Sequence, residues 1–123
     1  MRAFEDKQRL ALNSRILSYL REQFPGHVAQ FDDRRLLEAV AALRVRAEAY
    51  GFGRQSSVLA FAVLCVTVSP NFDRHEHIHQ LLSEAHLPAD FRIAYLADAI
   101  SEAEWDDARK MGGSLLPTKV ASQ

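Results

Sequence analysis

The longest apolar segment of the chain lies near its middle, within residues 55–72, a stretch that contains no charged residue. From Val58 to Val68 every side chain except Thr67 is apolar. A helix that is apolar on all sides has to be buried on all sides, and this run is too short to cross a bilayer, which takes about 20 residues. We therefore expect a central helix at about residues 56–68, buried on every side, with the other helices packed around it.

The other apolar residues recur with the period of amphipathic helices, and turn residues separate the segments. Pro25 and Gly26 end the first segment, residues 27–31 are expected to form a linker, and Gly51 is expected in a left-handed cap after the second segment. The residues after Val63 are rich in β-branched side chains, but a strand here would have no partner, because no other segment alternates with a period of two. The expected helices, besides the central one, span residues 3–24, 33–50, 74–86, 89–99 and 102–111.

These segments predict an all-α fold, a compact single-domain bundle of five to six helices around the buried central helix. With 123 residues the chain is long enough for one ordinary domain with its own core. The helical domain is expected to cover residues 1–113. Residues 114–123, which follow two glycines, are expected to form a flexible C-terminal tail.

The apolar stripes also indicate which side chains face inward. In the helix at 33–50, which Asp32 or Asp33 should cap, arginines alternate with acidic residues, and this favours a solvated, salt-bridged face over an anion-binding site. The four arginines expected mostly outside the buried stripe are Arg34, Arg35, Arg44 and Arg46. The expected inward-facing residues include Leu36, Leu37, Val40, Leu43 and Ala47 in this helix, Ile78, Leu81, Leu82 and Ala85 in the helix at 74–86, and Phe91, Ala94, Tyr95 and Leu96 in the helix at 89–99.

The balance of charge argues against two classes of partner. Lys and Arg number 15 and Asp and Glu number 16, for a formal net charge of −1. Nucleic-acid binders usually carry a basic patch, and helices that lie on membranes are rich in Lys and Arg, so we expect neither partner. The first residues are charged and contain no apolar signal-peptide segment, from which we expect a cytoplasmic protein. Cys65, the only cysteine, lies in the most apolar stretch and should act as a small hydrophobic side chain.

One motif raises the question of a zinc enzyme. The stretch from His75 to His79 reads H-E-x-x-H, in which two histidines one helical turn apart bind zinc and the glutamate, here Glu76, activates a metal-bound water. A further ligand is needed, and in one class of these enzymes it is a histidine ten residues after the first. That position is Ala85 here, and the nearest histidine is His86.

A local structural role explains the same residues. Asp73 and Glu76 have the spacing of a capping box, which places the motif in the solvated first turn of a helix. We therefore expect no catalytic residue, no metal site and no cofactor, and retain a small zinc hydrolase that uses His75, Glu76 and His79 only as an alternative.

The C-terminal helix offers the candidate partner-binding residues. Ser101 and Glu104 form a second capping-box pattern, and Trp105 is expected on the inner face of the helix that follows. An exposed tryptophan would be a hot-spot candidate, so we name Trp105 with the acidic Asp106 and Asp107 as candidate partner-binding residues.

Two stretches carry a resemblance to a family. Ala49-Tyr50-Gly51-Phe52, an apolar helix and then Ser69-Pro70-Asn71-Phe72-Asp73 resemble small uncharacterised all-helical proteins of Gram-negative bacteria with an "A-x-x-Y-G … G-P-x-F-D" pattern. Such proteins tend to be encoded beside type VI secretion spike, adaptor and effector genes. Ser69 stands where many of them have glycine. The resemblance implies an accessory role in loading or protecting a secreted toxin, and it implies no active-site residue.

We therefore expect a non-enzymatic protein-binding accessory protein, a chaperone or adaptor for a secretion-associated effector or spike component. A groove between helices would cover an apolar segment of the partner. This hypothesis predicts an exposed apolar patch, on the order of several hundred Å², or a stable homo-oligomer interface. Two alternatives stay open at this point: an immunity-type inhibitor whose acidic C-terminal helix meets a basic toxin cleft, and the zinc hydrolase.

Overall fold

A computed structural model describes residues 2–116, with their side chains from residue 7 onward, and none of these residues lies in a strand. The elements are α1 (Arg2–Gln23), α2 (Pro25–Val28), α3 (Asp33–Ala49), α4 (Gln55–Thr67), the 3-10 helix η1 (Phe72–Arg74), α5 (Glu76–Leu82), α6 (Ala89–Ala99) and α7 (Glu102–Arg109). The all-α prediction is confirmed. Most of the tail expected at residues 114–123 lies outside the described residues, and Leu115 packs against the core.

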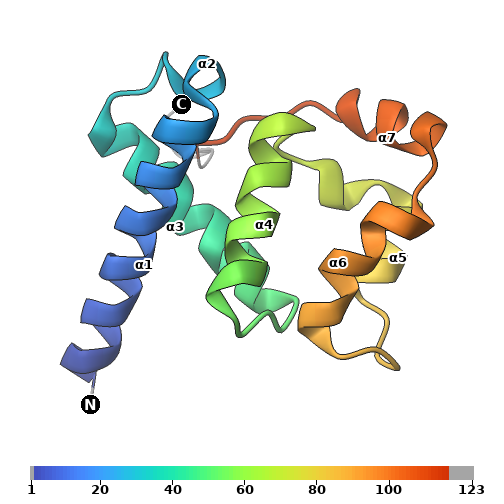
Figure 1. Cartoon of the computed structure of the whole chain (residues 1–123), viewed down its shortest axis with the longest axis horizontal. Coiled ribbons are helices and arrows are strands. Elements are labelled where there is room, and N and C mark those ends of the chain that lie inside the picture. The colour runs from blue at the N-terminus through green and yellow to red at the C-terminus, as the bar shows by residue number, and fades with distance from the viewer. Residues whose placement is uncertain (1, 117–123) are drawn as a thin grey trace, which may run out of the picture.

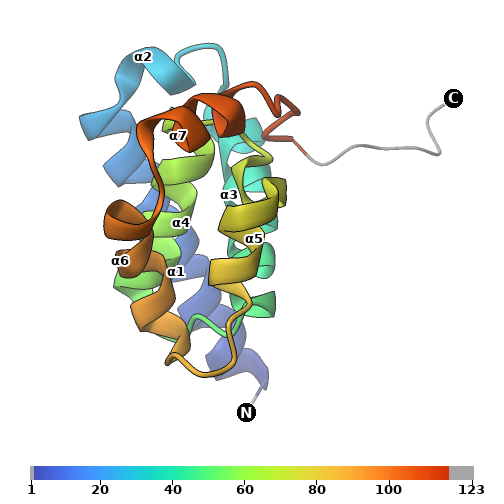
Figure 2. The ribbon, with the colours of Figure 1, turned by 90° about the vertical axis from the view of Figure 1, so that its right-hand side faces the viewer.

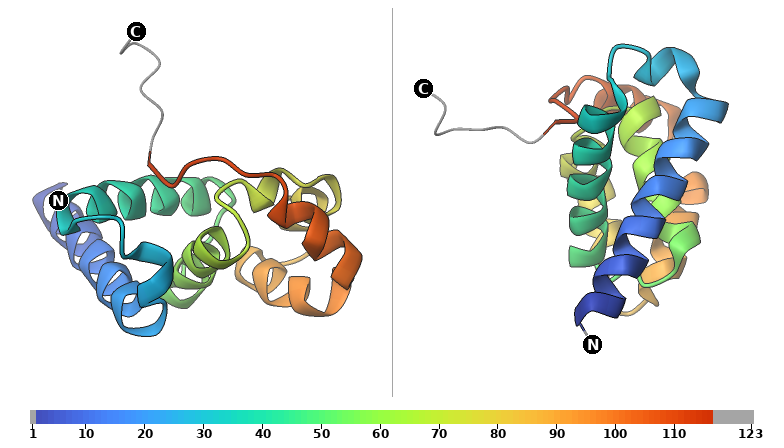
Figure 3. Two further views of the ribbon diagram at one scale, coloured as in Figure 1. Left: turned by 90° about the horizontal axis from the view of Figure 1, so that it is seen from above. Right: turned by 90° about the vertical axis from the view of Figure 1, so that its left-hand side faces the viewer.

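The helices form two layers with α4 in the middle. In Figure 1, α1, α4 and α6 run side by side across the front of the molecule, and α3 and α5 lie behind them. Figure 2 shows the two layers from the side with α7 across one end, and Figure 3 shows them from above. Helix α4 contacts α1, α3 and α6, so the expected central helix is present.

The prediction that α4 is buried on every side is wrong for one face. Val58, Phe61 and Cys65 are buried in the core. On the side between α1 and α6, the apolar side chains of α4 are only half-buried: Leu59, Ala60, Val63 and Leu64. Although α4 is apolar, no helix of the described part is both long and apolar enough to cross a membrane.

The end of α3 follows the expected glycine cap. Gly51 has a φ of +96°, its N–H donates to the carbonyl of Glu48, and the N–H of Phe52 donates to the carbonyl of Ala47. These two bonds define a Schellman motif, which glycine favours because it has no Cβ to clash in the left-handed region. The buried Phe52 ring then stacks on Tyr50, with ring centroids 5.9 Å apart.

The segment expected to be a linker after Pro25 contains a short helix. Proline is compatible with the first position of a helix, since that position needs no N–H donor, and α2 begins at Pro25. Val28, at its end, is fully buried. Pro25 thus ends α1, as expected, and also begins the next turn.

The capping box expected at Asp73 is absent. Asp73 lies in η1, and α5 begins only at Glu76, with His75 as its N-cap and no side-chain cap. The helix ends at Leu82 rather than near His86, and Ala85 is exposed. The physical reason is competition, because the Asp73 carboxylate accepts hydrogen bonds from distant side chains instead of a local N–H.

Those distant donors are Arg46 in α3 and Tyr50, the residue that follows α3. The buried Asp73 carboxylate accepts the Tyr50 hydroxyl at 2.8 Å and pairs with the guanidinium of Arg46. Arg46 also donates to the carbonyl of Pro70 at 3.0 Å, and its guanidinium lies over the Phe61 ring at 5.3 Å. The Asp73 clamp, defined here as Asp73 with Arg46 and Tyr50, joins α3 to the turn that follows α4.

Several side chains face the opposite way from the sequence prediction. Arg44, expected outside, is buried and donates to Asn13 at 2.9 Å and to Glu48 at 3.0 Å. In α6 the buried positions are Ile93, Leu96 and, just after the helix, Ile100. The residues that were expected inside but are exposed are Leu37, Ala94, Phe91 and Tyr95. Helix α6 has two apolar stripes, and contact with α4 and α5 selects the aliphatic one.

Replacing Asp73 by alanine tests the clamp. The change removes one acceptor from both Arg46 and Tyr50, so we expect the free energy of unfolding to fall by about 3 kcal/mol, the lower end of the range for a broken buried ion pair. The lower end applies because the Arg46 side chain keeps 32% exposure. Urea denaturation measures the change. Asp33→Ala, at an exposed carboxylate paired with Arg21, is the matched control and should cost less than about 1 kcal/mol; equal losses would contradict the clamp.

Candidate functional site

The half-buried face of α4 forms the floor of an open apolar groove between α1 and α6. Leu59, Ala60 and Val63 form the floor. The wall on the α1 side consists of Leu12, Ile16 and Tyr19, and the wall on the α6 side consists of Ile93, Ala94 and Phe91. These floor and wall residues define the apolar groove; Ile16 and Ile93 in it are buried, and its other side chains are half-buried or exposed.

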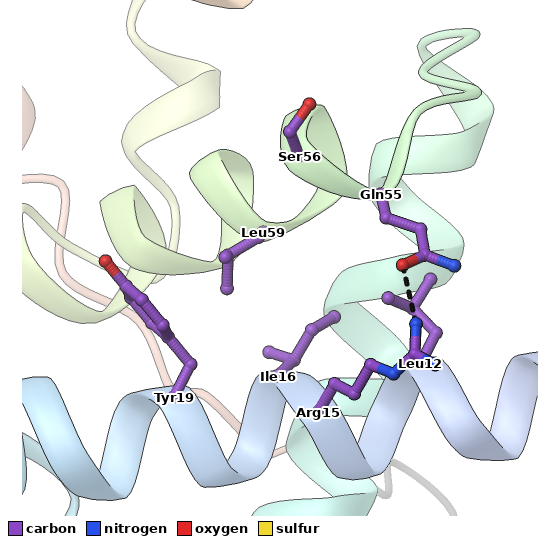
Figure 4. Close-up of a pocket in the computed structure, with 7 residues that line it drawn as sticks. All are labelled: Leu12, Arg15, Ile16, Tyr19, Gln55, Ser56 and Leu59. Carbon is purple, nitrogen blue, oxygen red and sulfur yellow. Dashed lines mark hydrogen bonds between the residues drawn. The ribbon is translucent and has the colours of Figure 1, made fainter.

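Figure 4 shows the half of the groove between α1 and α4. Tyr19 extends from α1 toward α4, and Leu59 extends from α4 toward α1. The hollow here has a volume of about 230 Å³. At its far end Arg15 donates to the Gln55 side chain at 3.0 Å and bridges the two helices.

A carboxylate of α6 caps the N-terminus of α4, and this contact fixes the α6 wall of the groove to α4. Helix α4 has Arg54 as its N-cap, without a hydrogen bond from the Arg54 side chain. The carboxylate of Asp90, in the first turn of α6, accepts the Arg54 N–H at 3.1 Å. The Ser57 hydroxyl and the Arg54 N–H lower the pKa of Asp90, because both donate to its charged form. Asp90 therefore supplies the N-terminal acceptor that the sequence of α4 lacks.

Helix α6 carries an exposed aromatic pair, of which Phe91 lines the groove. The rings of Phe91 and Tyr95 stack with centroids 6.0 Å apart, and the residues are 52% and 39% exposed. The sequence prediction missed this surface because it assigned both aromatic residues to the core. The spacing of Ile93, Leu96 and Ile100 was the signal for the true buried face, although it did not exclude the aromatic stripe.

The candidate residues on α7 lie apart from the groove lining. Trp105 is partly buried and packs against the core, while Asp106 and Asp107 are exposed. Asp106 forms an ion pair with Arg109 on the same helix. The three residues share one short helix, but none of them lines the groove.

The histidines of the H-E-x-x-H stretch have separate surroundings. His75 precedes α5, so the motif does not lie within one helix. Nδ1 of His77 lies 2.5 Å from the Glu104 carboxylate, and Nδ1 of His79 lies 3.1 Å from the Tyr50 hydroxyl. Within residues 2–116, no group of three or more His, Cys, Asp or Glu side chains is placed to hold a metal ion.

Two groups that could act as nucleophiles are held in their protonated forms. Burial raises the pKa of the Cys65 thiol to about 12. Burial and the hydrogen bond to Asp73 raise the pKa of the Tyr50 hydroxyl well above its usual range. A nucleophile reacts through its deprotonated form, so neither side chain is activated for catalysis.

The capping box of α7 is present as predicted and gains a tertiary partner. Ser101 Oγ accepts the Glu104 N–H at 3.2 Å, and the Glu104 carboxylate accepts the Ser101 N–H at 2.9 Å. Through His77 the same carboxylate connects α7 to α5. The Ser101 N–H, followed by the contact with His77, lowers the pKa of Glu104 to about 2.

Comparisons of the chain with protein-family models, with curated proteins and with solved structures find no match.

The pKa of Glu104 predicts how stability depends on pH. A carboxyl whose pKa is lower in the folded state, about 2 instead of 4.5, stabilises the fold above pH 4.5, and this contribution is lost as the pH falls toward 2. We expect Glu104→Gln to be less stable than the wild type at pH 7, with a difference that narrows across this window in urea denaturation. Glu102→Gln, at an exposed carboxylate of the same first turn, should have a smaller effect. A gap that is constant with pH would contradict the assignment.

Proposed function

We propose that this chain is a non-enzymatic protein-binding accessory protein that acts as a chaperone or adaptor. The apolar groove over α4 carries the proposal. A helix of the partner would lie between α1 and α6 and cover the floor formed by Leu59, Ala60 and Val63. While it is bound, an apolar segment of the partner would be shielded from water.

The energetics of apolar burial favour a helical partner. Each large apolar side chain that becomes buried contributes about 1.5–3 kcal/mol. Association costs about 4–15 kcal/mol in lost freedom, so a partner needs several such anchors in register. An amphipathic helix presents one every three or four residues along a single face, which suits a groove that runs along α4.

The resemblance noted in the sequence makes a secretion-associated effector or spike component the expected partner. The residues that carry the resemblance have structural roles here: Tyr50 and Gly51 close α3, and Asp73 is the acceptor of the clamp. They build the scaffold behind the groove. A chaperone or adaptor of this kind needs no catalytic group.

A charge placed in the groove floor tests the proposal. We expect Leu59→Glu to reduce capture of a stoichiometric partner from the native host by about tenfold or more, because partner binding would bury a carboxylate without a counter-charge. Affinity purification followed by quantitative mass spectrometry measures the capture. Val45→Glu, which introduces the same side chain at an exposed apolar position of α3, is the matched control and should leave capture unchanged.

Thermal unfolding of each variant separates lost binding from lost folding. If Leu59→Glu unfolds, Tyr19→Glu on the exposed wall of the groove provides the same test. Equal capture by the wild type and the groove variants would contradict the proposed site. One zinc per chain in the eluate, with a hydrolytic activity that Glu76→Gln abolishes, would overturn the non-enzymatic assignment.

A further inference from the structure

The two ends of the groove carry opposite charges. At the Gln55 end, Arg15 extends from α1 and Arg54 stands immediately before α4. Toward the other end, α1 carries the exposed Glu22 and α6 carries the exposed Asp98. Helices α1 and α6 run in the same direction, as Figure 1 shows, and Glu22 and Asp98 are each the second-last residue of their helix.

Three of these four charges, on Arg15, Glu22 and Asp98, have no ion-pair partner among the described side chains, whereas the charge of Arg54 acts on the neighbouring Asp90 carboxylate. Arg15 donates to the neutral amide oxygen of Gln55, and Arg54 uses its backbone N–H to bind Asp90. Asp90, the acidic residue at the arginine end, already accepts the N–H groups at the start of α4.

The spacing of the charges sets the length of the ligand. Arg15 and Glu22 lie on one edge of α1 and are separated by two helical turns, about 10 Å along the axis. Two turns of a second helix, lying along the groove, span the same distance. The apolar floor occupies the space between the charged ends, at Leu59 and Val63.

We propose that the segment bound in the groove is an amphipathic helix with a carboxylate at one end of its apolar stripe and a lysine or arginine about two turns away. The inference rests on the proposed function and adds the charge pattern of the partner. The carboxylate of the bound helix meets Arg15 and Arg54, whose guanidinium groups suit carboxylates, and its basic side chain meets Glu22 and Asp98. This charge pattern fixes the direction and register of the helix, since apolar contacts alone would allow it to slide.

The hollow at the Arg15 end suits one apolar anchor of the bound helix. It has a volume of about 230 Å³ and is lined by Leu12, Ile16 and Leu59. The neighbouring carboxylate of the bound helix would lie beside Arg15.

A display experiment tests the charge pattern directly. The probe is a library of surface-displayed peptides, about five helical turns long, with a fixed apolar stripe and with Glu, Lys or Gln varied at both ends of the stripe. The library is selected against the wild type and against a double variant, Arg15→Glu with Arg54→Glu. Arg34→Glu with Arg35→Glu, at exposed positions of α3, changes the net charge equally and is the matched control.

We expect the wild type to enrich peptides with Glu at one end and Lys at the other. The same peptides should bind the Arg15/Arg54 double variant about tenfold more weakly at low salt, with a smaller loss at high salt, and should bind the control variant unchanged. The double variant should select Lys at the end where the wild type selects Glu. Circular dichroism verifies that each variant is folded.

The remaining outcomes separate this inference from the proposed function. Enrichment of the apolar stripe with no charge preference would overturn the inference and leave the groove as a helix-binding site. Binding no better than that of a scrambled peptide would overturn both. A wild-type dimer that Leu59→Glu dissociates would also overturn both, because a second copy would then occupy the groove.

Discussion

The architecture depends on one buried carboxylate. Asp73 lies in the turn after α4, and its two donors are Arg46 on α3 and Tyr50, which follows the last residue of α3. A carboxylate buried without such donors would cost several kcal/mol, so the arrangement is stable only when all three side chains meet. Their contact holds η1 against α3, in the layer behind α4. The covalent connection then places α5 in the same layer.

The open face of α4 lies between α1 and α6. With α3 behind it and α1 and α6 at its flanks, α4 keeps a strip of apolar side chains that none of the described helices covers. The walls of the strip are anchored, since Arg15 bridges α1 to α4 and Asp90 bridges α6 to α4. A groove whose walls are already positioned requires little ordering on binding, and this favours affinity.

The capping residues show where sequence patterns succeed. The box at Ser101 and Glu104 and the glycine cap at Gly51 were both predicted, because each consists of hydrogen bonds between residues a few positions apart. The same pattern at Asp73 and Glu76 failed. There the carboxylate has two side-chain donors, Arg46 and Tyr50, which lie more than 20 positions away in the chain and which no local pattern reveals. Arg46, which binds Asp73, was expected on a solvated face, because its partner is far away in the sequence.

The sequence by itself determined the all-α class, most of the helix boundaries and the central position of α4, since these follow from apolar periodicity and local turn chemistry. It also indicated that a binding function would need an exposed apolar surface. Only the tertiary structure decided where that surface lies. Whether α6 buries Phe91 and Tyr95 or Ile93 and Leu96 depends on which neighbours it meets, and α4 has no polar side to show which of its faces stays open. The buried face of α6 and the open face of α4 are both consequences of contacts between residues far apart in the chain. The periodicity of a single segment does not encode such contacts.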